Sequence, residues 1–425
     1  MDIARAENAS RSITARCCIV GGGPAGMMLG YLLGRAGIET VVIEKHKDFF
    51  RDFRGDTVHP STLEVMDELG LVDDFLKLPH QKLRQITGYV GKTPMRIADI
   101  GRSCAKHPFI AFMPQWDFLN FLREQARRYS ALTVLMQTAA TDLVVRDGIV
   151  TGVRAVDGTG ALEIKADLVV GCDGRHSLVR ARADLAVKEI GAPMDVLWFR
   201  VGKGAEADAA FARIEAGRMM ITLDRGDYWQ CAYVIRKGGY DAVKAQGLPA
   251  FRQQVCGLAP ALTSRIDDVA SWDDVKLLTV AINRLTRWAR PGLLCIGDCA
   301  HAMSPVGGVG VNLAVQDAVA AANLLTDKLR DGRPSLSDLG AVQKRREFPT
   351  RITQAMQVLV QNNIISRALT PDGTPFAPPL PIRIINAVPW LQGLTARFLA
   401  VGIRPEHVYS RQAGALGDSQ VHQRL

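Results

Sequence analysis

The feature that most constrains this chain is a glycine-rich turn near its start. A short apolar run at residues 17–20 leads into Gly21, Gly23 and Gly26, spaced as GxGxxG, and a helical pattern over residues 24–36 follows. In such a unit the first glycine allows a tight turn, the second lets a pyrophosphate approach the backbone, and the third lets the helix pack against the strand. The pattern therefore predicts a strand–turn–helix unit whose helix N-terminus faces a phosphate group.

A second apolar run ends in an acidic residue that fits the same unit. Thr40–Ile43 is rich in β-branched residues and is followed by Glu44, eighteen residues after Gly26. A carboxylate at the tip of the second strand can accept a hydrogen bond from a ribose hydroxyl. We therefore expect a dinucleotide site, with an ordinary glycine-rich turn as the alternative. The turn does not identify the dinucleotide.

Composition narrows the classes of protein and of partner. The chain has 425 residues, a net charge of +9, and no apolar run of the ~18 residues that a membrane span needs, so we expect no integral membrane segment. Lysine and arginine are scattered, which argues against nucleic acid as a partner. The eight cysteines form no CxxC pair and no zinc-like group with histidine, so we expect no metal site. The polar start lacks the core of a secretion signal, and we expect a cytoplasmic protein.

Strands typical of a buried parallel sheet come from three separated stretches. Besides the opening stretch, residues 167–171 run into Asp173, and residues 293–296 run into Asp298. Alternating and aromatic-rich segments between residues 187 and 285 instead predict a mostly antiparallel sheet. This interleaving argues against a simple dehydrogenase, whose two nucleotide-binding halves are adjacent in sequence.

The third stretch carries a second strong motif. After Asp298 come a loop with Pro305 and several glycines and then a long alanine-rich helix that begins near Val309. Backbone N–H groups at that helix N-terminus can face an electron-rich group, and Asp298 can bind a hydroxyl of a sugar chain.

Taken together, these motifs resemble those of the FAD-dependent aromatic hydroxylases. These are the class A, single-component flavoprotein monooxygenases related to para-hydroxybenzoate hydroxylase. The motifs span residues 19–317. The resemblance implies that Glu44 binds the adenosine ribose, that Asp173 lies near the pyrophosphate, and that Asp298 holds the ribityl chain. It implies FAD as cofactor and these cofactor-binding residues: Gly21, Gly23, Pro24, Ala25, Gly26, Glu44, Lys45, Arg54, Gln115, Asp173, Asp298, Pro305, Gly308, Gly310, Val311 and Asn312.

The resemblance also implies a fold class and a division of the chain. The fold is α/β, with a Rossmann-like FAD-binding domain interleaved with a mostly antiparallel β-sheet substrate domain and followed by a helical C-terminal region. The expected segments are FAD-binding 14–84, sheet 85–107, FAD-binding 108–186, substrate-binding sheet 187–290, FAD-binding 291–345 and C-terminal helices 346–425.

The reaction that the resemblance implies is a hydroxylation. NAD(P)H would reduce FAD. The sequence has no second GxGxxG unit that would form a separate NAD(P)H domain. O2 would then give a flavin hydroperoxide that oxidises an aromatic, phenolic or quinone-like small molecule. We expect Pro305 beside the flavin, and His59 and Arg200 are candidates for proton transfer and substrate binding. Further candidates in the sheet, each of which could equally be a core or surface residue, are Trp198, Met219, Met220, Tyr228, Trp229 and Tyr233.

Three other functions are alternatives to hydroxylation. A halogenase is disfavoured because the Trp-x-Trp-x-Ile-Pro signature is absent. An O2-independent FAD-dependent reductase and a non-enzymatic flavin-binding sensor remain possible. The amphipathic stretch Ile382–Val401 could touch a membrane, although we expect it to pack against the protein, and the chain could be a monomer or a dimer.

Overall fold

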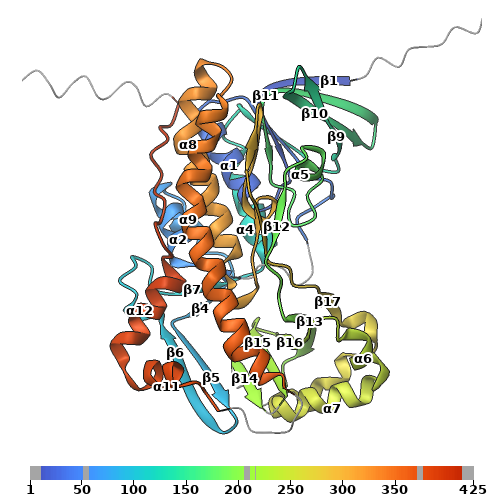
Figure 1. Ribbon diagram of the computed structural model, residues 1–425, viewed down its shortest axis with the longest axis vertical. Helices are drawn as coiled ribbons and strands as arrows, with labels where there is room; N and C mark the ends of the chain where they lie inside the picture. The colour runs from blue at the N-terminus through green and yellow to red at the C-terminus, as the bar shows by residue number, and fades with distance from the viewer. Residues whose placement is uncertain (1–10, 51–56, 205–210, 216, 371–376, 414–425) are drawn as a thin grey trace, which may run out of the picture.

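The computed structural model describes residues 11–50, 57–204, 211–215, 217–370 and 377–413. The molecule is elongated, with one sheet at each end and two long helices running along its length (Figure 1). Arg54 lies outside the described residues.

The first sheet contains the strands that the three separated stretches predicted. Its main path follows the order β19-β20-β11-β1-β2-β8, and the pairs from β20 to β8 are parallel. The strands on this path are β1 (Arg11–Val20), β2 (Thr40–Ile43), β8 (Leu132–Leu135), β11 (Gly160–Gly171), β19 (Ala289–Arg290) and β20 (Leu293–Cys295). Both faces are covered, and the central strands are buried, as parallel sheets require. This sheet confirms the Rossmann-like half of the expected fold.

An antiparallel hairpin extends this sheet. β9 (Ala139–Arg146) pairs with β10 (Ile149–Asp157), which also pairs with β11. The turn residues Asp147 and Gly148 have φ values of 49° and 76°. Positive φ at both central residues is the mark of a type I′ turn, so Asp147-Gly148 forms the two-residue turn that this dipeptide favours.

The second sheet has seven strands in the order β17-β13-β16-β15-β14-β5-β6. Its strands are antiparallel except for the β14–β5 pair. They are β5 (Gln85–Val90), β6 (Thr93–Asp99), β13 (Met194–Gly202), β14 (Ala212–Glu215), β15 (Arg218–Asp224), β16 (Tyr228–Arg236) and β17 (Lys276–Leu278). Helix α7 (Leu248–Leu258) packs on one face, where Phe251 meets Phe199.

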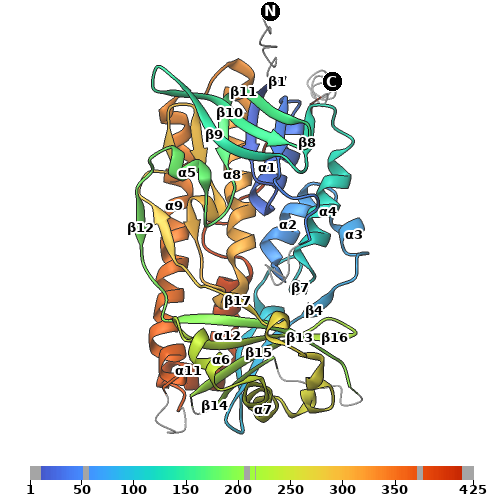
Figure 2. The same ribbon diagram turned by 90° about the vertical axis from the view of Figure 1, so that its right-hand side faces the viewer.

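Long helices connect the two ends (Figure 2). α8 (Gly310–Asp331) packs against α1 (Pro24–Arg35) and α9 (Leu336–Val360). The helix Val306–Asp331 is long and apolar enough to cross a membrane by length and composition, but 78% of its most apolar window is buried inside the protein.

The chain then continues to the far end of the molecule. α9 passes into a π-helix (Gln361–Ile365) and α10 (Ser366–Ala368), and α11 (Leu380–Ala387) and α12 (Pro389–Ala400) lie beside β6. Other described elements are α2 (Pro60–Glu68), α3 (Val72–Phe75), α4 (Gln115–Ala126), α5 (Leu178–Arg182), α6 (Tyr240–Ala245), β3 (Thr57–Val58), β4 (Gln81–Leu83), β7 (Ile110–Phe112), β12 (Val187–Glu189), β18 (Asn283–Leu285) and β21 (His301–Ala302).

Candidate functional site

The glycine-rich turn between β1 and α1 has the geometry that its three glycines predicted. Gly21 has a φ of +107°, a conformation that other residues rarely adopt. A Cβ on Gly26 would lie 1.9 Å from the carbonyl oxygen of Gly21, so only glycine fits there. A Cβ on Gly23 would meet nothing within 4 Å, because this residue borders a cavity. The backbone of the turn is thus open to a ligand at Gly23 and closed to side chains at Gly26.

Glu44 stands at the tip of β2 beside this turn. Its two carboxylate oxygens accept hydrogen bonds from the backbone N–H groups of Gly22, at 3.0 Å, and His46, at 3.1 Å. The side chain is almost completely buried and borders the same cavity. The two backbone donors therefore fix the position of the carboxylate at the edge of the cavity.

Two acidic loops meet on the far side of the turn. Asp173 follows β11 and accepts hydrogen bonds from the Ser177 hydroxyl, at 2.5 Å, and from the N–H of Val179 at the start of α5. Asp298 follows β20, and its carboxylate lies 3.7 Å from the guanidinium of Arg175. Arg175 thus joins the two loops where both border the cavity.

The loop before α8 carries Pro305. Gly307 and Gly308 have φ values of 81° and 65°, and the carbonyl of Gly308 accepts a hydrogen bond from the Thr57 hydroxyl at 2.9 Å. The first N–H groups of α8, which include that of Val311, have no acceptor within the helix and carry partial positive charge. A wall of loop backbone and a helix N-terminus therefore border the middle of the cavity.

A buried face of α9 and its π-helical extension holds this loop from behind. The side chain of Gln357 accepts from the N–H of Ser304 at 3.1 Å and donates to the carbonyls of Ser304 and Val306, both at 2.9 Å. Gln361 donates to the Ser304 hydroxyl at 2.5 Å. One turn earlier, Gln354 donates to the carbonyls of Asn283 and Ala302. These three buried glutamines form what we call the glutamine face.

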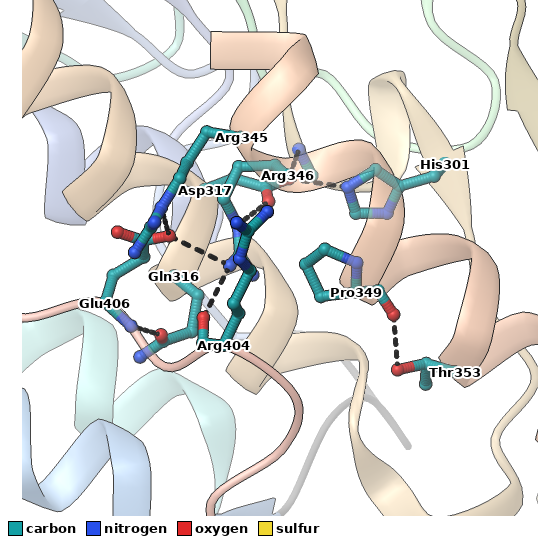
Figure 3. A network of polar contacts seen from close by, with 10 residues as sticks. His301, Gln316, Asp317, Arg345, Arg346, Pro349, Thr353, Arg404 and Glu406 are labelled. Carbon is teal, nitrogen blue, oxygen red and sulfur yellow. Dashed lines mark hydrogen bonds and ion pairs between the residues drawn. The ribbon is translucent and has the colours of Figure 1, made fainter.

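A buried charge network fixes the loop that carries Asp298 (Figure 3). Asp317 of α8 accepts hydrogen bonds from the Gly297 N–H at 3.0 Å, from His301 Nε2 at 2.5 Å and from Arg346 Nε at 3.0 Å. Burial alone would raise the pKa of Asp317, but the charges and hydrogen bonds of these donors outweigh burial and lower it. Arg346 also contacts Glu406, 3.2 Å away, which ties the C-terminal segment to the network.

One continuous cavity of about 1610 Å³ joins these parts. It begins between the glycine turn and Glu44, passes the Pro305 loop and ends in a chamber under the seven-stranded sheet. Pockets for a single small ligand span roughly 300–1,000 Å³, so this cavity has room for two. The chamber is apolar, and its walls include Ile86, Met95, Phe112, Val196, Trp198 and Ile221.

The structure brings most of the predicted residues to the cavity. The predicted residues that border it are Gly21, Gly23, Pro24, Ala25, Glu44, Lys45, Gln115, Asp173, Asp298, Pro305, Gly308, Gly310 and Val311, together with Trp198 and Met219 of the sheet. Their shared position along one cavity is the basis on which a cofactor-binding role is proposed for them below.

Four of the described catalytic and cofactor-binding candidates lie outside the cavity lining. Gly26 is enclosed by the turn, and the Asn312 side chain accepts hydrogen bonds from Ser61 and Thr62 of α2. His59 is completely buried, and its Nδ1 lies 2.8 Å from the carbonyl oxygen of Leu399 in α12, outside the cavity lining. Arg200 lies on the same face of β13 as Trp198 but beyond the lining, with its guanidinium over the Tyr228 ring.

The sheet candidates divide by the strand period of two. Met220, Trp229 and Tyr233 belong to the core that packs under α7 and point away from the cavity. The cavity face of β13 instead presents Met194 and Val196. Residue type had selected the candidates, whereas alternation decides which of them can touch a ligand.

Sequence reasoning missed the glutamine face. The spacing of Gln354, Gln357 and Gln361 places them on one side of a helix, and a polar stripe in an otherwise amphipathic helix was the available signal. Its partners could not be named, because they lie 51 to 71 residues earlier in the chain, and all but the Ser304 hydroxyl are backbone groups.

Comparisons with known proteins show what this chain is similar to. The family model described as "FAD binding domain" matches residues 14–356. A 6-methylpretetramide 4-monooxygenase from Streptomyces rimosus is 32% identical over 361 residues, which cover 82% of this chain and 84% of the relative.

Two solved structures share the fold. PqsL from Pseudomonas aeruginosa, in complex with 2-aminobenzoylacetate, has a TM-score of 0.69 at 22% identity and covers 85% of this chain and 98% of its own. The p-nitrophenol 4-monooxygenase PnpA from Pseudomonas putida has a TM-score of 0.70 at 19% identity, over 92% of this chain and 95% of its own.

Proposed function

This chain belongs to the family of FAD-dependent aromatic hydroxylases, and from that membership we propose that it uses NAD(P)H and O2 to hydroxylate a largely apolar aromatic, phenolic or quinone-like molecule. The observation that carries the proposal is the single cavity. It links a nucleotide-type glycine turn to an apolar chamber through the Pro305 loop. Such a shape suits a long cofactor that presents its reactive end to a separate substrate.

The residues along the cavity fit FAD. We assign Gly23 and the N-terminus of α1 to the pyrophosphate, Glu44 to the adenosine ribose, and Asp298 to the ribityl chain. Pro305, Gly308 and Val311 would border the ring system. When bound, FAD supplies the electron and oxygen transfer chemistry, and the protein supplies orientation, electrostatics and exclusion of water.

The start of α8 has an electrostatic role in this assignment. The free N–H groups around Gly310 and Val311 would stabilise negative charge on a ring system bound beside them. The glutamine face keeps the adjacent loop in one position, and the apolar chamber keeps water away from the reacting atoms.

The chamber constrains the substrate as well as the solvent. Among the described lining residues, the strands of the seven-stranded sheet contribute no aspartate, glutamate, histidine, lysine or tyrosine, and the acids of the cavity lie at the glycine turn and the two acidic loops. A phenol bound there would have no side-chain base beside it. We therefore propose that the substrate is reactive through its own electron-rich ring or its own ionisation, and that binding depends mainly on apolar contact.

Two further proposals follow from the same data. We assign residues 85–107 and 187–290 to the substrate side, since β5, β6 and β13–β17 form one sheet over the chamber. We also propose a cytoplasmic location, because the eight cysteines are free thiols in the structure, as a reducing compartment would keep them.

The test is turnover by the purified, yellow holoenzyme. We expect phenols, quinones or polycyclic aromatics to stimulate NADPH or NADH oxidation, with isotopically labelled oxygen appearing in the product. Hydrogen peroxide measured in parallel reports uncoupled turnover. A reduced product without oxygen incorporation would indicate a reductase, and flavin binding without any substrate-stimulated oxidation would indicate a sensor. Either result would overturn the hydroxylase proposal.

A further inference from the structure

We infer that the α11–α12 hairpin docks on an anionic lipid surface and presents the mouth of the substrate cavity to it. The hairpin lies at the end of the molecule that carries β5 and β6, opposite the β9–β10 hairpin (Figures 1 and 2). The inference of lipid binding is argued from surface features alone. Its consequence, delivery of a lipophilic substrate, rests on the proposed function.

The hairpin is apolar on the side that faces away from the protein. On its inner side, Ala396 and Ala400 are fully buried against neighbouring elements, and the Thr395 hydroxyl donates to the carbonyl of Ile97 in β6. Four large apolar side chains on α11 and α12 nevertheless remain 44–69% exposed: Leu380, Ile384, Trp390 and Leu394. Packing of the hairpin, which the sequence led us to expect, is therefore compatible with a second apolar contact. Tryptophan beside aliphatic residues suits a membrane interface.

Among the described residues, the exposed charges on the hairpin and on the adjoining β5–β6 pair are all basic. Four exposed basic residues lie on the hairpin and on the adjoining β5–β6 pair, and none has an ion pair within the part of the chain that the structure describes: Lys92, Arg96, Arg383 and Arg397. Described residues between 348 and 405 include no aspartate or glutamate. In β5 and β6 the one acid is Asp99, which is buried and lies 3.4 Å from Arg102.

This charge pattern selects among possible occupants. A second copy that met this surface across a twofold axis would bring the same basic residues face to face, which is unfavourable. An anionic bilayer instead attracts basic residues and accepts the exposed tryptophan and aliphatic side chains in its interfacial layer. Charge complementarity therefore favours lipid over self-association.

The docking surface is continuous with the cavity. Leu394 and Arg397 line the cavity and also belong to the exposed surface, and so do Met356 and Leu359 at the end of α9, which are 42% and 54% exposed. A lipophilic molecule dissolved in the bilayer could thus enter the chamber without crossing bulk water. The apolar lining of the chamber matches such a molecule.

The experiment measures binding of the full-length holoprotein to lipid vesicles by sedimentation. The probes are mixed phosphatidylglycerol–phosphatidylcholine vesicles and pure phosphatidylcholine vesicles, each at low and high salt. We expect binding to the anionic vesicles that weakens as salt rises, and weak binding to neutral ones. Flavin absorbance of the pellet identifies the folded holoprotein, so the readout does not depend on any turnover.

Two variants and one control locate the surface. R96Q/R383Q removes two charges outside the cavity lining and should lower the partition constant by about 25-fold, since each basic residue near an anionic surface contributes about a fivefold factor. W390S should lower it on neutral and anionic vesicles alike. The control R146Q/K165Q removes two exposed charges from β9 and β11 at the opposite end and should change little.

Three outcomes would overturn the inference. One is equal binding to neutral and anionic vesicles, and another is an equal loss in the control and in R96Q/R383Q. The third is a dimer in lipid-free buffer that W390S converts to a monomer, which would assign the surface to a second copy. If vesicles bind as expected but no substrate is ever oxygenated, the docking inference stands and the proposed function fails.

Discussion

The side chain of Gln357 pairs with the backbone of Ser304 as one peptide group pairs with another. Its Oε1 accepts from the Ser304 N–H at 3.1 Å, and its Nε2 donates to the Ser304 carbonyl at 2.9 Å. The same Nε2 reaches the carbonyl of Val306, so a single amide binds both neighbours of Pro305. The position of the loop that would border the flavin is therefore set by a helix that bears no sequence motif.

The first prediction concerns this contact. Q357M removes the three hydrogen bonds while keeping the volume of the side chain, and it frees the Pro305 loop beside the apolar chamber. We expect the share of NAD(P)H oxidation that yields hydrogen peroxide to rise several-fold and the affinity for FAD to fall by about tenfold. Peroxide assays and flavin fluorescence titration measure the two effects.

Its control is Q354M on the same helix. Gln354 is equally buried and also makes hydrogen bonds, but to Asn283 and Ala302 rather than to the Pro305 loop. Both variants should lose about 2 kcal/mol of unfolding free energy. Only Q357M should uncouple turnover, and an equal peroxide yield from both would show that the glutamines act through stability alone.

The second prediction separates two glycines of the opening turn. Because a Cβ at position 26 would lie 1.9 Å from the Gly21 carbonyl oxygen, G26A should cost about 3 kcal/mol or more and prevent correct folding. Gly23 has a φ of −73° and open space where its Cβ would point, so G23A should keep the melting temperature of the apoprotein. Its new methyl group would lie on the side facing the cavity, and FAD affinity should fall.

Circular dichroism of the apoprotein and FAD titration check this pair. If G23A binds FAD as tightly as the wild type, the pyrophosphate does not bind at this turn. A G26A variant that melts normally would contradict the close packing of turn and helix.

Local patterns predicted many of the residues that border the cavity. Each of Gly21, Glu44 and Asp298 was predicted from a short local pattern. Gly21 belongs to a glycine turn before a helix, and Glu44 and Asp298 each follow the end of a strand. The family that these motifs indicated is confirmed by the match over residues 14–356. The interleaved α/β fold is also confirmed, since strands from three stretches form one sheet.

The positions of the other candidates depend on contacts between distant parts of the chain. Both faces of β13 are apolar, with Val196 on one and Phe199 on the other, and the cavity face is decided by where α7 packs. His59 is held by Leu399, which lies 340 residues later in the chain. Neither relationship leaves a local signal in the sequence.

The third prediction concerns the buried Asp317. All three of its partners, Gly297, His301 and Arg346, donate hydrogen bonds, whereas an asparagine offers one oxygen and adds two donors of its own. D317N should therefore cost about 3 kcal/mol at neutral pH. The exposed Asp327 on the same helix, paired with Arg330, supplies the control, and D327N should change the stability little.

The pH dependence of this loss tests the charge. Since folding lowers the pKa of Asp317, its contribution is present above the unfolded value of about 3.9 and is lost as the pH falls through the lower folded value. The difference in unfolding free energy between wild type and D317N should therefore shrink below about pH 4. A difference that stays constant from neutral to acidic pH in urea titrations would contradict an ionised Asp317.

The last prediction concerns the pH dependence of turnover. Burial lowers the pKa of His59 to about 4, so this histidine is neutral across the working range and contributes no titration near neutrality. The strands of the seven-stranded sheet contribute no aspartate, glutamate, histidine, lysine or tyrosine to the described lining of the cavity. With a series of phenols of graded acidity, the alkaline-rising limb of kcat/KM should therefore follow the pKa of each phenol. A limb that keeps the same midpoint for every phenol would instead reveal a protein base. The variant H59N, which keeps a hydrogen-bond donor towards Leu399, would then show whether that base is His59.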